Sequence, residues 1–134
     1  MLSPEQKNRL VKAAAEARQL AYAPYSNYRV GAALLDKEGR IYTGVNVENA
    51  AYPTSICAER SAVFSAVSSG ARQFNAIAVV TRNAGTPCGS CRQVLSEFGL
   101  DILVLVADEQ AEIVQSLTVR DLLPHSFGPG DLNI

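Results

Sequence analysis

Three cysteines place the strongest constraint on how this chain can fold. Cys57 stands two residues before Glu59, and Cys88 and Cys91 belong to a Pro-Cys-x-x-Cys motif further along the chain. Cysteine thiolates are common ligands of Zn²⁺, which prefers four tetrahedral positions. If all three sulfurs bind one ion, the fold must bring both segments together. Three protein ligands then leave one position for water, as in catalytic zinc sites.

The spacing of these residues indicates where on helices they lie. Cys88 and Cys91 are three residues apart, so they share one face at the start of a helix. Cys57 and Glu59 diverge along a helix body and converge only around a first turn. We therefore expect two helix N-termini to point at one metal ion, where helix dipoles favour thiolates. Arg60 is expected to donate a hydrogen bond to a cysteine sulfur and so tune the metal.

Capping and hydrophobic patterns predict helices that alternate with strands. Residues 3–6, Ser-Pro-Glu-Gln, are typical of a helix start. A buried helical stripe is expected to follow, up to Pro24, from Leu10, Val11, Ala14, Ala17, Leu20 and Ala21. Further helices are expected over about 57–69, 89–98 and 118–123, strands over 29–35, 40–47, 74–81, 102–107 and 113–117, and an irregular tail after 125.

This alternation predicts an α/β fold. The apolar strands would form one central mixed sheet with helices packed on both faces, a three-layer α/β/α sandwich. The two strands around the turn at 36–39 would form a hairpin. One domain is expected to span residues 1–134, and the strand order cannot be read from one sequence.

Composition argues against several classes of protein. The formal net charge of −1 provides no basic surface for nucleic acid or anionic membranes. No stretch approaches 18 uninterrupted apolar residues, so no membrane span is expected. The N-terminus lacks a signal-peptide pattern, so we expect a cytoplasmic protein. Reduced thiols in that compartment suit metal binding better than disulfides.

A zinc ion beside a carboxylate that is not a ligand suits hydrolysis. Zinc activates water near neutral pH. The Cys-x-Glu and Pro-Cys-x-x-Cys pair resembles the three-cysteine variant of the zinc nucleobase deaminase motif. In such a reaction Glu59 would take the water proton, pass it to a ring nitrogen of the base and later protonate the departing ammonia.

Other interpretations of the cysteines remain open. A structural zinc knot would need a fourth ligand, and the single histidine, His125, lies far away in the tail. A redox Cys-x-x-Cys would leave Cys57 and Glu59 without a role. Three inert buried thiols would require this spacing to arise by chance.

Several further segments occur in an order that is typical of one family. They are YAPYS at 22–26, VGAAL at 30–34, NVENAAY at 46–52, CGSCRQ at 88–93 and LLP at 122–124. With them the chain resembles the small homotetrameric cytidine deaminases over nearly its whole length. The resemblance implies the cytidine deaminase fold and one zinc ion per subunit. It also implies hydrolysis of cytidine and deoxycytidine to uridine and deoxyuridine, in pyrimidine salvage.

The same resemblance implies residues that bind the nucleoside. Asn46 and Glu48 would hydrogen-bond the ribose hydroxyls. Tyr28 stands where the family usually has Phe and would stack on the pyrimidine, although its hydroxyl then needs a partner.

It also implies residues near a subunit boundary. Ala51 and Tyr52 would line the ribose pocket there, and Phe127 would reach the active site of a neighbouring subunit. Ala58 completes the expected substrate-binding set.

Several functions are alternatives to the deamination of a nucleoside. A zinc protein without turnover would have no use for Glu59 or an open coordination position. Deaminases of blasticidin S are similar in size and motif, but the pair Asn46 and Glu48 favours a nucleoside. That pair would also have no purpose for free cytosine. Nucleotide deaminases and nucleic-acid editors should carry basic groups for phosphates, which the net charge does not indicate.

Overall fold

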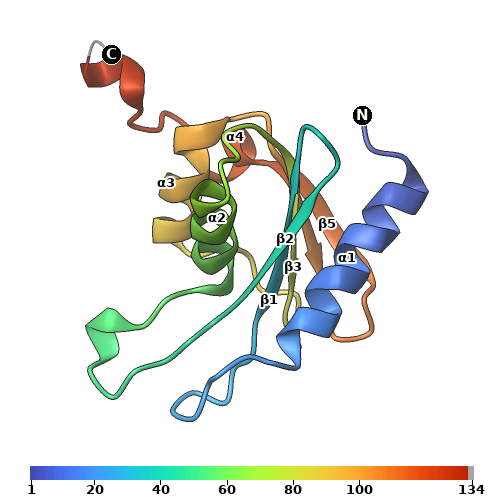
Figure 1. Cartoon of the computed structure of the whole chain (residues 1–134), viewed down its shortest axis with the longest axis vertical. Helices are drawn as coiled ribbons and strands as arrows, with labels where there is room; N and C mark the ends of the chain where they lie inside the picture. The colour runs from blue at the N-terminus through green and yellow to red at the C-terminus, as the bar shows by residue number, and fades with distance from the viewer. Residues whose placement is uncertain (133–134) are drawn as a thin grey trace.

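The computed structural model describes residues 1–132, which form a five-stranded sheet with helices on both faces (Figure 1). In chain order the elements are α1 (Pro4–Arg18), β1 (Gly31–Asp36), β2 (Ile41–Val45), the 3-10 helix η1 (Tyr52–Thr54), α2 (Ala58–Ser68), β3 (Phe74–Val80), α3 (Gly89–Phe98), β4 (Leu103–Ala107), β5 (Ile113–Thr118), α4 (Val119–Leu122) and the 3-10 helix η2 (Pro129–Leu132).

The sheet is mixed, as the sequence predicts. Its strand order is β2-β1-β3-β4-β5. Only β3 and β4 run parallel, with Ala78 opposite Leu105, and the other neighbours are antiparallel. A parallel pair needs a crossover connection, and α3 provides it between β3 and β4. Residues 81–88 connect the end of β3 to the start of α3, and Cys88 is the last residue of this loop.

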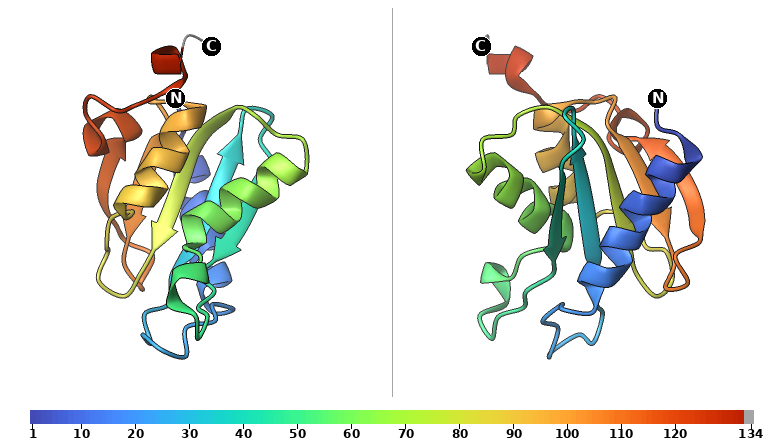
Figure 2. Two further views of the ribbon diagram at one scale, coloured as in Figure 1. Left: turned by 90° about the vertical axis from the view of Figure 1, so that its left-hand side faces the viewer. Right: turned by 45° about the vertical axis from the view of Figure 1, so that its right-hand side comes forward.

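Two apolar cores, one on each face of the sheet, confirm the three-layer architecture. Leu10, Val11 and Ala14 of α1 are buried against one face. Ala62 and Val63 of α2, with Leu95 of α3, belong to the core on the other face. Figure 2 shows α1 on one side of the sheet and α2 and α3 on the opposite side.

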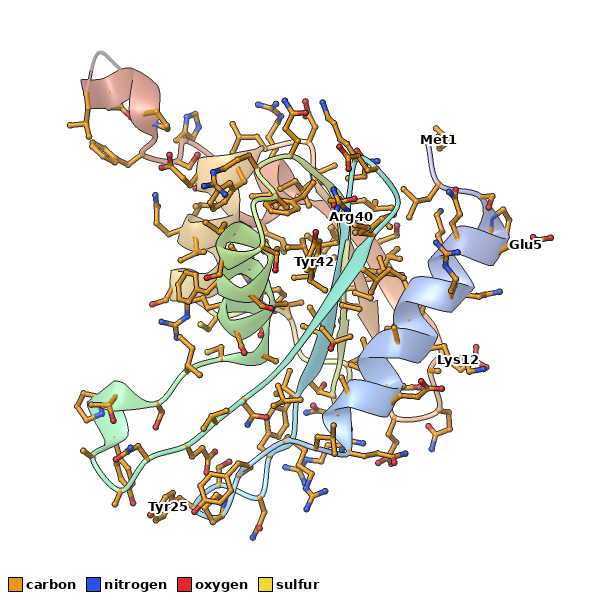
Figure 3. The ribbon with its side chains drawn as sticks, in the orientation of Figure 1. Met1, Glu5, Lys12, Tyr25, Arg40 and Tyr42 are labelled. Carbon is orange, nitrogen blue, oxygen red and sulfur yellow. The ribbon has the colours of Figure 1, made fainter. Side chains whose placement is uncertain are left out.

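The predicted hairpin of β1 and β2 is confirmed, and Asp36 organises its turn. Asp36 Oδ1 accepts hydrogen bonds from the backbone N–H groups of Glu38 and Arg40, both at 2.9 Å. Its Oδ2 accepts from Tyr42 Oη at 3.2 Å and from Arg40 Nε at 3.3 Å. Arg40 and Tyr42 lie close together at this end of the sheet (Figure 3). The buried carboxylate thus satisfies four donors around one tight turn.

Helix α1 begins as predicted but ends earlier. The capping box between Ser3 and Gln6 is present, whereas the helix ends at Arg18 and not near Pro24. Leu20, expected in the buried stripe, is 80% exposed. The reason is a competing backbone pairing, because Tyr22 exchanges hydrogen bonds with the segment after β2. Its N–H donates to the carbonyl of Asn46 at 3.0 Å, and its carbonyl accepts from the N–H of Glu48 at 2.9 Å.

The other differences are small. The predicted loop before α2 contains η1, and the predicted irregular tail contains η2. Among residues 1–132, none of the helices combines the length and the apolar character that crossing a membrane requires.

Helix α2 packs unusually close to β2, and Gly44 makes this possible. A Cβ atom at Gly44 would lie 2.4 Å from the backbone nitrogen of Ala62 and 2.5 Å from the carbonyl oxygen of Ala58. Neither backbone atom can move without moving the helix. Because α2 carries Glu59 in its first turn, this contact fixes how close Glu59 lies to the sheet.

We expect Gly44→Ala to lower the free energy of unfolding by about 1–3 kcal/mol, since overpacking forces α2 away from the sheet. Urea denaturation measures the loss. Gly128→Ala is the control, because a Cβ at Gly128 would meet nothing within 4 Å. Equal stability of the two variants would contradict the proposed close contact.

Candidate metal centre and active site

Three cysteine sulfurs converge at the N-termini of two helices. Cys57 is the N-cap residue of α2 and Cys88 is the N-cap residue of α3, and neither side chain makes a capping hydrogen bond. Cys91 lies in the first turn of α3 and is fully buried. The Sγ atoms of Cys57 and Cys88 are 3.7 Å apart, and those of Cys88 and Cys91 are 3.5 Å apart. The sequence predicted this meeting of two helix starts.

The sulfur cluster has the size that a zinc ion requires. A tetrahedral ion with Zn–S bonds of about 2.3 Å separates its sulfurs by about 3.8 Å. All three sulfurs lie within 4.8 Å of one another, and the cysteines are free thiols. In the part of the chain that the structure describes, no fourth protein ligand joins this group. His125 lies at a separate cavity beside Leu100 and Arg120, so it does not close the site.

Arg60 supplies positive charge to the sulfur cluster. Its Nη2 donates a hydrogen bond to Cys57 Sγ at 3.2 Å, which is the contact expected from the sequence. Hydrogen bonds from Cys91 and from Arg60 lower the pKa of the Cys57 thiol to about 5. The same contact with Cys57 raises the pKa of Arg60 above its usual value. A thiolate is therefore favoured here, and a thiolate is the form that binds metal.

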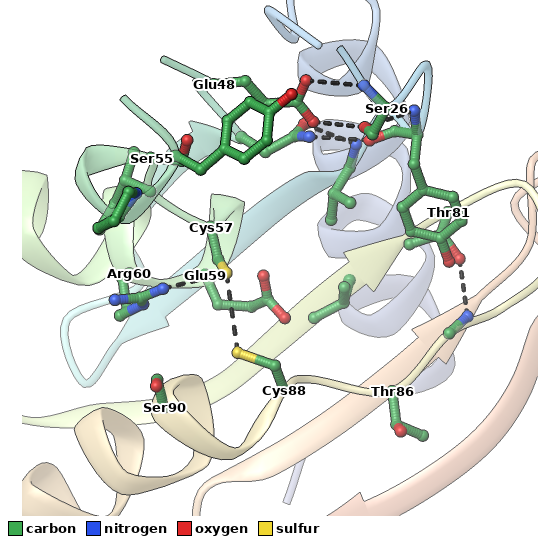
Figure 4. Close-up of a pocket in the computed structure, with 18 residues that line it drawn as sticks. Ser26, Glu48, Ser55, Cys57, Glu59, Arg60, Thr81, Thr86, Cys88 and Ser90 are labelled. Carbon is green, nitrogen blue, oxygen red and sulfur yellow. Dashed lines mark hydrogen bonds between the residues drawn. The ribbon is translucent and has the colours of Figure 1, made fainter. Parts of the chain in front are cut away.

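Glu59 lies beside the sulfurs without belonging to their cluster. It occupies the first turn of α2, is only 5% exposed and lines the same cavity as Cys57 and Cys88. Figure 4 shows the Glu59 carboxylate directed into the space next to these two sulfurs. Burial raises its pKa to about 7. A carboxyl group in this environment can both accept and donate a proton near neutral pH.

These groups open into a cavity of about 620 Å³. Cys57, Cys88 and Glu59 form one side, and Ser26 and Glu48 lie on the opposite side (Figure 4). Tyr28 and Asn46 also line it. The volume is in the range of small-molecule sites, and polar groups at both ends suit a ligand that is polar at both ends.

Glu48 fastens the segment before β1 to the cavity. Its Oε1 accepts hydrogen bonds from the backbone N–H groups of Tyr25 and Ser26, both at 3.0 Å, and its Oε2 accepts from Ser26 Oγ. The Ser26 hydroxyl, together with these N–H groups, lowers the pKa of the Glu48 carboxyl. Glu48 is therefore a carboxylate held in a fixed position.

Asn46 is held in a similar way. Its Oδ1 accepts from the N–H of Val30 at 2.8 Å, and its Nδ2 donates to the carbonyl of Tyr28 at 2.8 Å. The side chain is 8% exposed. An amide retains a second N–H and a second lone pair after these two bonds. One donor and one acceptor thus remain for a ligand.

Tyr28 lines the cavity, and its hydroxyl has the partner that the sequence required. Tyr28 Oη donates to Asn83 Oδ1 at 2.6 Å. The guanidinium carbon of Arg82 lies 5.4 Å from the centre of the Tyr28 ring. Asn83 therefore contacts the hydroxyl end of the Tyr28 side chain, and Arg82 contacts one face of its ring.

Three of the expected substrate-binding residues do not line the cavity of their own chain. Ala58 is fully buried in the core beneath α2, and Ala51 is exposed in the loop before η1. Phe127 is 57% exposed in the tail, and its carbonyl accepts from Gln93 Nε2. Tyr52 does line the cavity. The implied roles of Ala51 and Phe127 at a neighbouring subunit stay predictions.

Sequence reasoning missed polar residues of the loop between β3 and α3. Thr81, Gly85 and Thr86 line the cavity, and Gly85 N–H donates to Thr81 Oγ1 at 2.7 Å. A signal was available, because these residues follow a buried strand and directly precede Pro87 and Cys88. Ser26 was also missed as a partner of Glu48, although it belongs to one of the matching segments.

Comparisons with known proteins agree with this geometry. The family model of the cytidine and deoxycytidylate deaminase zinc-binding region matches residues 4–107. A cytidine deaminase from Halalkalibacterium halodurans is 48% identical over 127 residues, which are 92% of this chain and 96% of the relative. A probable cytidine deaminase from Dictyostelium discoideum is 42% identical over 134 residues, 98% of this chain and 90% of the relative.

Solved structures give the same result. The crystal structure of cytidine deaminase from Burkholderia pseudomallei superposes with a TM-score of 0.86 at 44% identity, covering 94% of this chain and 100% of that one. Cytidine deaminase from Mycobacterium tuberculosis gives 0.80 at 40% identity, covering 90% and 96%. The predicted family and α/β fold are confirmed, and the chain belongs to the zinc-dependent cytidine deaminase family.

Proposed function

We propose that this protein hydrolyses cytidine to uridine and ammonia, and deoxycytidine to deoxyuridine and ammonia, with zinc held by Cys57, Cys88 and Cys91. One observation carries the proposal: three free sulfurs meet at two helix N-termini, and two of them, those of Cys57 and Cys88, share a cavity with the buried Glu59. Relatives named cytidine deaminase, which match over most of the chain, support it. We assign the activity to a single domain that spans residues 1–134.

The reaction adds water across the ring C=N bond whose carbon carries the amino group, and then releases ammonia from that carbon. When bound, zinc supplies a Lewis acid that brings the pKa of a water molecule toward neutrality. Glu59 accepts a proton from that water and delivers it to the ring nitrogen of the base. Glu59 then takes the proton of the hydroxyl group added to the base and passes it to the amine as the C–N bond breaks, so the carboxylate ends as it began. Such proton transfer contributes about 10²–10⁴-fold to the rate.

The opposite side of the cavity suits a neutral sugar. The free donor and acceptor of Asn46 match ribose hydroxyls, and Glu48 is a fixed carboxylate that repels a phosphate. Among the described lining residues Arg60 is the one cation, and it is engaged with Cys57. These groups favour a nucleoside over a nucleotide. Tyr28 offers its ring to the pyrimidine.

A homo-oligomer, specifically a tetramer, is part of the proposal. Tyr52 is 69% exposed beside the cavity, and Phe127 is exposed in the tail. Aromatic side chains in such positions suit contacts between subunits. Phe127 would then complete the site of a neighbouring subunit. A cytoplasmic location and a role in pyrimidine salvage complete the proposal, and free thiols suit that compartment.

Removal of one sulfur should empty the metal site. We expect Cys88→Ala to lose zinc and turnover together, since two thiolates do not hold the ion. Zinc per chain, measured by elemental analysis after dialysis, tests this. Ser68→Ala is the control, because Ser68 is exposed at the end of α2 and lies outside the cavity. Zinc retention by Cys88→Ala at the wild-type level would reject these ligands.

Glu59→Gln separates proton transfer from metal binding. The variant should keep its zinc, while kcat for cytidine falls by at least about 10²–10⁴-fold. Ammonia release and zinc content are measured on the same sample. Glu97→Gln, at an exposed position on α3, provides the control and should keep full activity. If Glu59→Gln turned over cytidine normally, the assigned role would be wrong.

A substrate panel tests the nucleoside assignment. We expect ammonia from cytidine and deoxycytidine, with kcat/KM at least about 100-fold above that for cytosine and cytidine monophosphate. Cytosine leaves the ribose-binding groups unpaired, and the monophosphate meets Glu48. Blasticidin S serves as the competing substrate. Preferential release of ammonia from blasticidin S or from the monophosphate would overturn the assignment.

A further inference from the structure

The hydroxyl of Tyr28 is held by the loop that leads to the metal ligands. Tyr28 Oη donates to Asn83 Oδ1 at 2.6 Å. Thr81 Oγ1 donates to the same oxygen at 3.4 Å, and it accepts from the N–H of Gly85 at 2.7 Å. Tyr28 stands just before β1, whereas residues 81–85 follow β3. This network therefore joins two edges of the cavity.

Gly85 leaves the space that the Tyr28 hydroxyl fills. A Cβ atom at Gly85 would lie 2.6 Å from Tyr28 Oη, and every other heavy atom beyond its chain neighbours would be at least 3.6 Å away. Contacts below 3.0 Å are essentially never found for real Cβ atoms. The hydroxyl is thus the group that a side chain at position 85 would have to displace. A phenylalanine ring, which lacks that oxygen, would remove the conflict.

Arg82 adds a third contact from the same loop. Its guanidinium lies over the Tyr28 ring at 5.4 Å from the centroid, within range of a cation–π interaction. The residues that line the cavity include Tyr28 but not Arg82. Three residues beyond Gly85, Cys88 begins the metal side of the cavity. The orientation of the ring is consequently tied to the loop that carries a metal ligand.

We infer that Asn83 and Gly85 are positioning residues: Asn83 holds the Tyr28 hydroxyl, and Gly85 leaves room for it, so that the ring forms a rigid wall for the pyrimidine. The inference rests on the proposed function for the identity of the ligand. A wall fixed before binding loses no freedom when the base packs on it, so it lowers KM for the nucleoside. The chemical step, which Glu59 serves, does not depend on it.

The test is a double-mutant cycle of Gly85→Ala and Tyr28→Phe. In the wild-type background, Gly85→Ala should raise KM for cytidine about tenfold, since the added methyl group displaces the Tyr28 hydroxyl and with it the ring. The kcat should stay within about twofold, because the reacting groups are unchanged. In the Tyr28→Phe background, Gly85→Ala should change KM by less than about twofold, because the colliding oxygen is gone. Zinc content should be equal in all four proteins.

A second variant tests the other half of the inference. Asn83→Ala should raise KM about as much as Tyr28→Phe does, about threefold to tenfold, because each removes the same hydrogen bond. The double variant should be no worse than either single variant. Gly130→Ala is the control, since a Cβ there would meet nothing within 4 Å.

Thermal unfolding of the wild type, Gly85→Ala, Tyr28→Phe and their double variant separates this inference from the proposed function. Gly85→Ala should lower Tm in the presence of Tyr28 and leave it unchanged beside Tyr28→Phe, whatever the substrate is. If the wild type fails to deaminate cytidine but the Tm cycle shows this coupling, the substrate is wrong and the positioning contact stands. Equal effects of Gly85→Ala in both backgrounds, on KM and on Tm, would overturn the inference.

Discussion

The meeting of two helix N-termini at three sulfurs is the constraint on which the rest of the site depends. Cys57 and Cys88 are N-cap residues of α2 and α3, so their thiolates face unpaired N–H groups and the positive ends of two helix dipoles. Arg60 adds a full positive charge through its hydrogen bond to Cys57. Three thiolates are tolerable in a small volume because these positive charges, and then a cation, compensate them. Glu59 is placed in the same first turn, so metal binding and proton transfer share one helix start.

The sheet and its helices hold this geometry from behind. Gly44 lets α2 approach β2 more closely than a residue with a Cβ atom would permit, and the loop 81–88 leads from β3 into α3. The substrate side is built from a different part of the chain, in which Glu48 and Asn46 fasten the segment before β1 by hydrogen bonds to its backbone. The two sides of the cavity are joined where Val47 exchanges backbone hydrogen bonds with Ile56, the residue before Cys57. The bond between Tyr28 and Asn83 joins them at a second place.

Local sequence signals predicted much of this structure, and contacts between distant segments account for what was missed. The capping box at Ser3 and the two helix starts at cysteine were predictable, because each depends on residues within one turn. The exposure of Leu20 was not, since α1 gives way to a backbone pairing of Tyr22 with a segment after β2. For the same reason the family resemblance implied that Asn46 and Glu48 bind a sugar but not that both already hold backbone groups. The strand order also depends on such long-range pairing.

We expect one zinc ion to be bound by three cysteine sulfurs and to keep one position for a ligand that is not protein. Zinc K-edge X-ray absorption spectroscopy of the purified protein measures this coordination. It should give three sulfur neighbours at about 2.3 Å and a single lighter neighbour at about 2.0 Å. Four sulfur or nitrogen neighbours from the protein, or fewer than three sulfurs, would contradict it.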